Sequence, residues 1–159
     1  MAIIDRKIVV LGDSGVGKTS IVQRYVNDRF SDNYRPTTGA QPLKKTLEHG
    51  GDTVKLVIWD VAGHLLNLHP AYSSDADGVL LVCDMSRVES AEVMKRWLGI
   101  ISAKLGNVPL VIAANKSDIA EFHQKCANQL PTGVHIVVTS AKTGSNVEKL
   151  FQDLISKIL

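Results

Sequence analysis

Apolar residues fall along this chain in short runs that are typical of buried strands. The five strongest runs predict parallel strands that are covered on both faces: Ile8–Leu11, Leu56–Trp59, Val79–Cys83, Leu110–Ala114 and Ile136–Val138. A sixth run, from Leu43 to His49, mixes charged residues into the pattern and predicts an edge strand. The pair Gly50-Gly51 follows it directly, so we expect a tight hairpin and an antiparallel partner for this strand.

Helical spacing fills the intervals between these runs. Val93, Trp97, Ile101 and Leu105 recur every four residues and predict a helix that Gly106 stops. A second apolar face, near the end of the chain, is made of these residues: Leu150, Phe151, Leu154, Ile155 and Ile158.

Both helices begin with plausible capping boxes, Ser86-Arg87-Val88-Glu89 and Ser145-Asn146-Val147-Glu148. A shorter helix is predicted from Ala120 to Leu130, ended by Pro131.

Alternation of strands and helices predicts a doubly wound α/β fold. We expect one domain, residues 1–159, with a mixed six-stranded sheet that is mostly parallel and has one antiparallel edge strand. Helices should cover both faces, and ligands should bind at the carboxyl ends of the strands. Two stretches lack a regular pattern, Asn27–Gln41 and Val61–Ala76, and loops of that length tend to be functional.

Composition narrows the functional classes only slightly. The net charge is +2 and no Lys/Arg-rich block is present, so nucleic-acid binding is not expected. Cys83 lies inside an apolar run and is expected to be a reduced core thiol, with Cys126 as the other cysteine. No stretch approaches the roughly 20 apolar residues of a membrane span.

The strongest chemical signal is a glycine loop between the first predicted strand and a helical pattern. The segment Gly12-Asp13-Ser14-Gly15-Val16-Gly17-Lys18-Thr19 has the spacing G-x-x-x-x-G-K-[ST] of a P-loop. Its backbone N–H groups and the following helix N-terminus favour phosphate. Lys18 can reach the β- and γ-phosphates, and the Thr19 hydroxyl can ligate Mg²⁺. The predicted phosphate-binding residues are therefore Asp13, Ser14, Gly15, Val16, Gly17, Lys18, Thr19 and Ser20.

Four further motifs occur in order at strand ends or in the loops. They are Pro36-Thr37-Thr38-Gly39, Trp59-Asp60-Val61-Ala62-Gly63, Asn115-Lys116-Ser117-Asp118 and Thr139-Ser140-Ala141-Lys142. Together with the glycine loop they resemble the five guanine-nucleotide motifs of the Ras superfamily of small GTPases, most closely the Rab branch. The resemblance covers the whole chain and implies a three-layer P-loop NTPase G domain.

The resemblance assigns a metal and γ-phosphate site. Thr37 lies 19 residues after Lys18, as in the family, and would be the threonine that senses Mg²⁺ and the γ-phosphate. Asp60 would hold Mg²⁺ through a water, and the Gly63 N–H would meet the γ-phosphate. The implied metal-binding residues are thus Thr19, Thr37 and Asp60.

The same resemblance assigns a guanine site. Asn115, Lys116 and Asp118 match the base-reading N-K-x-D motif, in which the aspartate accepts hydrogen bonds from guanine N1–H and the 2-amino group. Adenine offers neither, and a missing hydrogen bond of this kind can discriminate by about 10⁴-fold. The other implied base contacts are Ser140, Ala141 with its N–H on the guanine oxygen, Lys142 lining the base, and Phe30 packing against it.

Several positions depart from the family pattern. His64 stands where the family has the glutamine that orients the attacking water, and the segment after it is short and unlike that of Rabs. Pro42 lies beside the effector segment, where it is expected to weaken strand pairing. The candidate catalytic residues are Lys18, Thr37, Gly63 and His64.

The leading functional hypothesis is a Mg²⁺-dependent guanine-nucleotide switch with slow GTP hydrolysis, and the Rab resemblance implies vesicle trafficking. A pseudo-GTPase scaffold and a P-loop kinase or ATPase are the alternatives, although the Asn115–Asp118 motif opposes the latter. Effectors, an exchange factor and an activating protein are expected at residues 27–41 and 61–76.

No lipidation signal is visible at Ala2 or near Leu159. We therefore expect a cytoplasmic protein, membrane-associated only if a lipidated tail is missing from this chain.

Overall fold

The computed structural model describes residues 1–31, 39–63, 68–119 and 124–159. Its helices and strands have these bounds: β1 Ile3–Gly12, α1 Lys18–Asn27, β2 Ala40–His49, β3 Asp52–Val61, α2 Pro70–Ser73, β4 Gly78–Asp84, α3 Val88–Leu105, β5 Leu110–Asn115, α4 Gln124–Gln129, β6 His135–Val138 and α5 Val147–Ile158.

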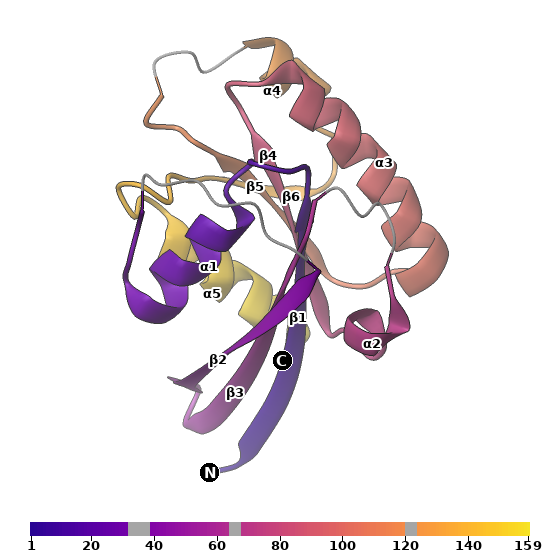
Figure 1. Cartoon of the computed structure of the whole chain (residues 1–159). Helices are drawn as coiled ribbons and strands as arrows, with labels where there is room; N and C mark the ends of the chain where they lie inside the picture. Colours follow the sequence, from indigo (N-terminus) through magenta and orange to yellow (C-terminus); the bar gives the residue numbers. More distant parts are fainter. Residues whose placement is uncertain (32–38, 64–67, 120–123) are drawn as a thin grey trace.

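The sheet has the order β2-β3-β1-β4-β5-β6, and every neighbouring pair is parallel except β2 with β3. Helices α1 and α5 lie on one face, and α2, α3 and α4 lie on the other (Figure 1). This confirms the mixed six-stranded sheet with one antiparallel edge strand. None of the helices in the described ranges combines the length and apolar character that crossing a membrane requires.

Two hydrophobic layers form because successive side chains of a strand point to opposite faces. Val10 of β1 and Leu80 of β4 belong to the layer under α1 and α5, whereas Val9 and Leu81 belong to the layer under α3. All seven residues of β4 are buried. Strands covered on both faces need apolar residues at every position, which is why a continuous apolar run predicted β4 correctly. The run Ile136–Val138 of β6 was also expected to be covered on both faces, but β6 is an edge strand and Val138 is exposed.

The edge strand is longer than predicted. It begins at Ala40 and runs through Pro42, so the expected weakening of strand pairing there was wrong. The Ala62 N–H donates to the Gly39 carbonyl at 2.7 Å, and hydrogen-bonded pairs alternate along an antiparallel ladder. Pro42, opposite Trp59, therefore stands at a non-hydrogen-bonded position and needs no N–H.

Both predicted capping boxes were wrong. The N-cap residues are Arg87 for α3 and Asn146 for α5, and neither makes a side-chain capping bond. The Ser86 hydroxyl donates instead to Asp84 at 2.6 Å, and the Asn146 amide donates to the Val138 carbonyl at 2.9 Å. Each side chain thus connects a helix start to the strand before it.

Two other expectations on irregular segments changed. The stretch 61–76 contains the short helix α2, and the predicted helix over 120–130 is described only as α4, because residues 120–123 lie outside the described ranges. The Gly50-Gly51 hairpin is confirmed, with φ of 58° and 86°, values that L side chains rarely adopt.

A stacked aromatic pair joins α1 to α5. The rings of Tyr25 and Phe151 are 3.8 Å apart and nearly parallel, and the ammonium of Lys45 lies 3.8 Å from the Tyr25 ring centre. Burial, with the nearby Glu148 carboxylate, raises the pKa of the Tyr25 hydroxyl well above its ordinary value. The pair fixes α1, and with it the glycine loop, against the last helix.

Replacement of Phe151 by alanine should lower the free energy of unfolding by about 3–5 kcal/mol, because a fully buried ring is lost from the α1–α5 layer. Denaturant unfolding at a fixed nucleotide concentration measures this. Val138→Ala, at an exposed apolar position, is the control and should change stability by less than about 0.5 kcal/mol. Equal stability of the two variants would contradict the role of the aromatic pair.

Candidate nucleotide-binding site

The predicted site residues that the structure describes gather at one edge of the sheet. Parallel strands place their carboxyl ends together, and the glycine loop, the Asp60–Gly63 segment, the Asn115–Asp118 segment and the Ser140–Lys142 segment follow β1, β3, β5 and β6. Thr37 and His64, two predicted catalytic residues, lie outside the described residues.

The glycine loop depends on missing Cβ atoms. Gly12 has φ +149° and Gly17 has φ +103°. A Cβ on Gly12 would lie 2.3 Å from the Val82 carbonyl oxygen, and one on Gly17 would lie 2.3 Å from the Asn115 amide nitrogen. Both glycines therefore allow backbone to approach the neighbouring strand ends closely, which fixes the loop at the start of α1.

Lys18 is a buried cation inside the loop. Its side chain is 5% exposed, and its ammonium donates to the Asp13 carbonyl at 2.7 Å. Burial lowers the pKa of Lys18 from its ordinary value to about 8, although the Asp60 and Asp13 carboxylates act in the opposite direction. An anion with several oxygens would stabilise such a charge, and the α1 N-terminus beside it favours the same kind of ligand.

The Thr19 hydroxyl donates to Asp60 at 2.5 Å. Asp60 is 3% exposed, and burial raises the pKa of its carboxyl, opposed by Thr19 and Lys18. Its second oxygen, Oδ1, has no hydrogen-bond partner among the described residues. A hydroxyl beside a buried carboxylate with a spare oxygen fits Mg²⁺, which prefers oxygen ligands, keeps several waters and needs one or two protein groups besides phosphate.

Gly63 lies directly against the glycine loop. A Cβ there would be 2.3 Å from the Ser14 nitrogen, 2.5 Å from the Asp13 carbonyl carbon and 2.7 Å from the Gly12 oxygen. The segment after β3 therefore meets the loop through backbone alone. The predicted pairing of the Gly63 N–H with the γ-phosphate stays a prediction.

Asn115 connects the phosphate end to the base end of the site. Its buried amide donates to the Val16 carbonyl at 2.9 Å, and its oxygen accepts from the Thr139 hydroxyl at 3.1 Å and the Ala141 N–H at 3.3 Å. Both ends of the amide are thereby used within the protein. The sequence placed Asn115 among the base-binding residues, and the structure shows it as the link between three segments.

Asp118 presents an exposed carboxylate at the same edge. One of its oxygens accepts from the buried Ser140 hydroxyl at 2.7 Å, which orients the group. Lys116 donates to the Gly15 carbonyl at 2.8 Å, and Lys142 is exposed. Phe30 is half-buried against the α1–α5 layer. Its contact with a base stays a prediction.

Sequence reasoning missed Asp84 and Arg87. The buried Asp84 carboxylate lies 3.0 Å from the Lys116 ammonium and 3.3 Å from Arg87 Nε, and Arg87 Nη2 donates to the Ser14 carbonyl at 2.8 Å. Burial opposes the Asp84 charge, but hydrogen bonds from Ser86 and Lys116 hold the pKa of its carboxyl below the ordinary value. The position of Asp84 directly after a buried run, like that of Asp60, is the signal that could have found it.

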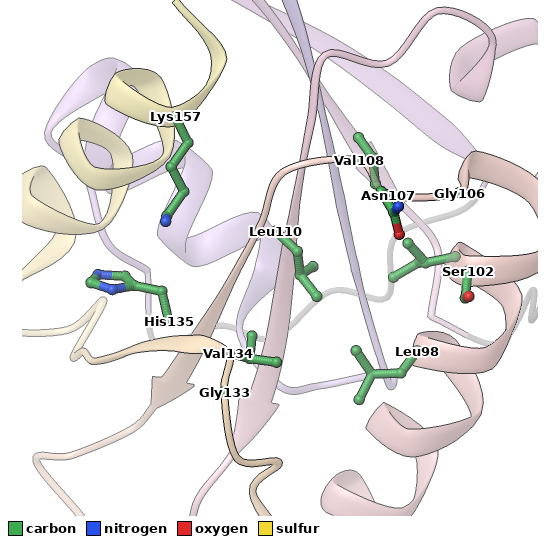
Figure 2. Close-up of a pocket in the computed structure, with 11 residues that line it drawn as sticks. Leu98, Ser102, Gly106, Asn107, Val108, Leu110, Gly133, Val134, His135 and Lys157 are labelled. Carbon is green, nitrogen blue, oxygen red and sulfur yellow. The ribbon is translucent and has the colours of Figure 1, made fainter.

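An open cavity of about 440 Å³ lies at the opposite end of the sheet. Apolar side chains such as Leu98, Leu110 and Val134 point toward one another there, with His135 and Lys157 on one side (Figure 2). It is lined by the last turns of α3 and α5 and by the starts of β5 and β6. The cavity is therefore separate from the predicted nucleotide site.

A family model described as the Ras family matches residues 7–159. The chain belongs to the Ras family. Ras-related protein Rab-31 of Rattus norvegicus is 38% identical over 166 residues, covering 99% of this chain and 85% of that protein. Ras-related protein Rab-22A of Homo sapiens is 34% identical, covering 99% and 86%. Ras-related protein Rab-5B of Plasmodium falciparum is 38% identical, covering 96% and 77%.

These relatives confirm the Rab branch of the Ras superfamily and a guanine-nucleotide switch as the function. Members of the family bind GTP and GDP with Mg²⁺, hydrolyse GTP and work with effectors, exchange factors and activating proteins. The pseudo-GTPase alternative has no support from the comparisons. A P-loop kinase or ATPase has none either.

Replacement of Gly63 by alanine should lower the free energy of unfolding by about 1–3 kcal/mol, because the new methyl group would collide with backbone atoms of the glycine loop. Gly99→Ala is the matched control. Its Cβ would meet nothing within 4 Å, and it lies inside α3. That control should raise stability by about 0.5–1 kcal/mol. Thermal unfolding at constant nucleotide concentration compares the two, and an unchanged melting temperature for Gly63→Ala would contradict the close contact.

Proposed function

We propose that this chain is a Mg²⁺-dependent switch of vesicle trafficking that hydrolyses GTP slowly. The observation that carries the proposal is the continuous hydrogen-bonded path from Val16 through Asn115 to Ala141, which joins a phosphate-binding loop to a base-reading segment. A nucleotide with a triphosphate and a guanine base spans that path. Vesicle trafficking comes from the Rab resemblance, since Rab proteins typically act there.

At the phosphate end, Lys18 and the N–H groups of the glycine loop bind the β- and γ-phosphates. Thr19, Thr37 and Asp60 are the residues we assign to Mg²⁺. When bound, the ion would neutralise charge on the phosphates and so favour transfer of the γ-phosphoryl group to water, with GDP as the leaving group. The unpartnered Asp60 Oδ1 supports this assignment, because it leaves a buried acceptor for a metal-bound water among the described residues.

The switch itself follows from contacts that only a triphosphate makes. Thr37 and the Gly63 N–H would contact the γ-phosphate, so residues 27–41 and 61–76 are held in one arrangement with GTP and released after hydrolysis. Gly63 already lies against Ser14 and Asp13, close enough for a small movement to make or break that contact. Effectors and regulators are proposed to bind these two segments.

At the base end, Asp118 reads guanine. Ser140 occupies one oxygen of the carboxylate at 2.7 Å, which orients the group toward the N1–H and 2-amino group of the base. The Ala141 N–H and Lys142 complete the site at the guanine oxygen and the ring. We assign cytoplasmic localisation, with membrane association only if a lipidated tail is missing from this chain.

Asp118→Asn should weaken GTP binding and shift preference toward a xanthine nucleotide, because the amide supplies a donor to the xanthine 2-oxo group. A missing hydrogen bond of this kind can change selectivity by up to about 10⁴-fold. Competition between GDP and XDP measures it. Asp153→Asn, at a carboxylate that binds Lys149 and His135 on the far side of the molecule, is the control and should keep the guanine preference. Full GTP affinity in the Asp118 variant would show that the base is read elsewhere.

Hydrolysis depends on how water is placed at the γ-phosphate. The glutamine of the family uses one amide as donor and acceptor together, whereas neutral His64 has one donor and one acceptor nitrogen on a rigid ring of different reach. Protonated histidine has no acceptor. Most of the rate should therefore come from Lys18, Mg²⁺ and backbone donors, which stabilise transition-state charge without His64.

Intrinsic GTP hydrolysis should be at or below roughly 10⁻⁴ s⁻¹, the scale of Ras-like proteins without an activator. His64→Gln should raise the rate several-fold, and His64→Ala should change it little. Single-turnover assays on the three proteins, each loaded with GTP, measure these rates.

A wild-type rate well above that scale, lost in His64→Ala, would show that His64 itself positions the water. Identical rates in all three proteins would instead show that residue 64 does not reach the phosphate.

A further inference from the structure

Arg24 lies on α1, outside every nucleotide-binding motif of the sequence. Its side chain is 20% exposed and reaches the segment after β6. Nε donates to the Ala141 carbonyl at 2.9 Å, and Nη2 donates to the Lys142 carbonyl at 2.5 Å. Nη1 donates to the Asp28 carboxylate at 3.1 Å. All three nitrogens of the guanidinium are therefore used, two of them on consecutive carbonyls of the base-reading segment.

These two contacts orient peptide groups. In a trans peptide the C=O and the following N–H point in opposite directions. Because Arg24 holds the Ala141 carbonyl toward α1, the Lys142 N–H of that peptide points away from α1. The preceding N–H, that of Ala141, donates to Asn115 Oδ1 at 3.3 Å. The segment is thus fixed between an arginine and an asparagine.

We propose that Arg24 is a positioning residue for guanine recognition, which acts by holding Ala141 and Lys142 so that their N–H groups meet the 6-oxo group of the base. The inference rests on the proposed base site. It adds a residue that no motif contains and that acts through another segment without touching the nucleotide.

The geometry also connects the two ends of the nucleotide. Arg24 is on the helix whose first residues are Lys18 and Thr19, so the phosphate-binding loop and the base-reading segment share one rigid element. Gly144, with φ +85°, lies beside the arginine, where an added Cβ would be 3.7 Å from its Cδ and Nε. A planar fork of donors suits two neighbouring carbonyls, whereas a lysine offers one point of attachment.

The test uses Arg24→Met, which keeps the apolar stem and removes the donors, and Arg24→Lys, which keeps the charge. Arg6→Met is the matched control, because Arg6 Nε also donates to a carbonyl, that of Ile158, at the same distance of 2.9 Å but far from the base site. The probes are GDP, IDP, which lacks the 2-amino group, and 2,6-diaminopurine riboside diphosphate, which has an amino group in place of the 6-oxo group and no proton on N1. Because Asp118 is unchanged in every variant, a change of the diaminopurine ratio between variants reports the 6-position.

Arg24→Met should weaken GDP binding about tenfold or more, since hydrogen bonds from a charged group are lost. Its preference for GDP over the diaminopurine nucleotide should fall by a similar factor. The preference for GDP over IDP should not change, because that ratio reports Asp118 alone. Arg24→Lys should lie between wild type and Arg24→Met, and Arg6→Met should bind all three nucleotides like the wild type.

Two results would overturn the inference. One is wild-type GDP affinity in Arg24→Met. The other is an equal loss for all three nucleotides, which indicates general loosening. If Arg24→Met does not fold, Arg24→Lys decides, and an unchanged diaminopurine ratio in it contradicts the proposal. A wild-type protein that binds all three nucleotides equally would instead refute the proposed base site, so the two failures are distinguishable.

Discussion

The contact between Gly17 and Asn115 is the constraint on which the site depends. Because residue 17 has no Cβ, the Asn115 amide can lie against the backbone at the start of α1 and donate to the Val16 carbonyl. A Cβ at position 17 would collide with the amide nitrogen, at 2.3 Å. The polar groups of Asn115 are buried, so their bonds are costly to break. The phosphate loop and the end of β5 are therefore held as one unit.

Charged side chains surround this contact in a connected network. Asp84 lies between Lys116 and Arg87, and these two cations donate to the carbonyls of Gly15 and Ser14 in the loop. Two carbonyls of the loop are thereby bound within the protein. Lys18 is the buried cation of the loop, and its burial favours a bound anion beside it.

Features that depend on a local residue pattern could be predicted from the sequence. Side-chain contacts between residues far apart in the chain could not. Buried parallel strands such as β4 need apolar residues at every position, so their runs were visible. The glycine loop has a fixed spacing of its own. By contrast, Arg87 binds a carbonyl 73 residues away and Arg24 one 117 residues away, and neither has a spacing that marks it. The capping boxes failed for a different reason, since Ser86 and Asn146 bind the ends of the strands just before them instead of the helix N–H groups.

The division of the core into two layers bears on how the two proposed switch segments open. Phe30, at the start of the first, packs in the layer of α1 and α5, while Leu68 and Tyr72, at the end of the second, are buried in the layer of α3. The sheet separates these anchors. Local opening near Phe30 therefore leaves the packing of Leu68 and Tyr72 intact, whereas opening at Gly39 and Ala62, which share a backbone hydrogen bond, involves both segments. Amide hydrogen exchange should therefore be independent at the two outer ends and shared where the segments meet, so that a protein bound to one outer end leaves the other free to exchange.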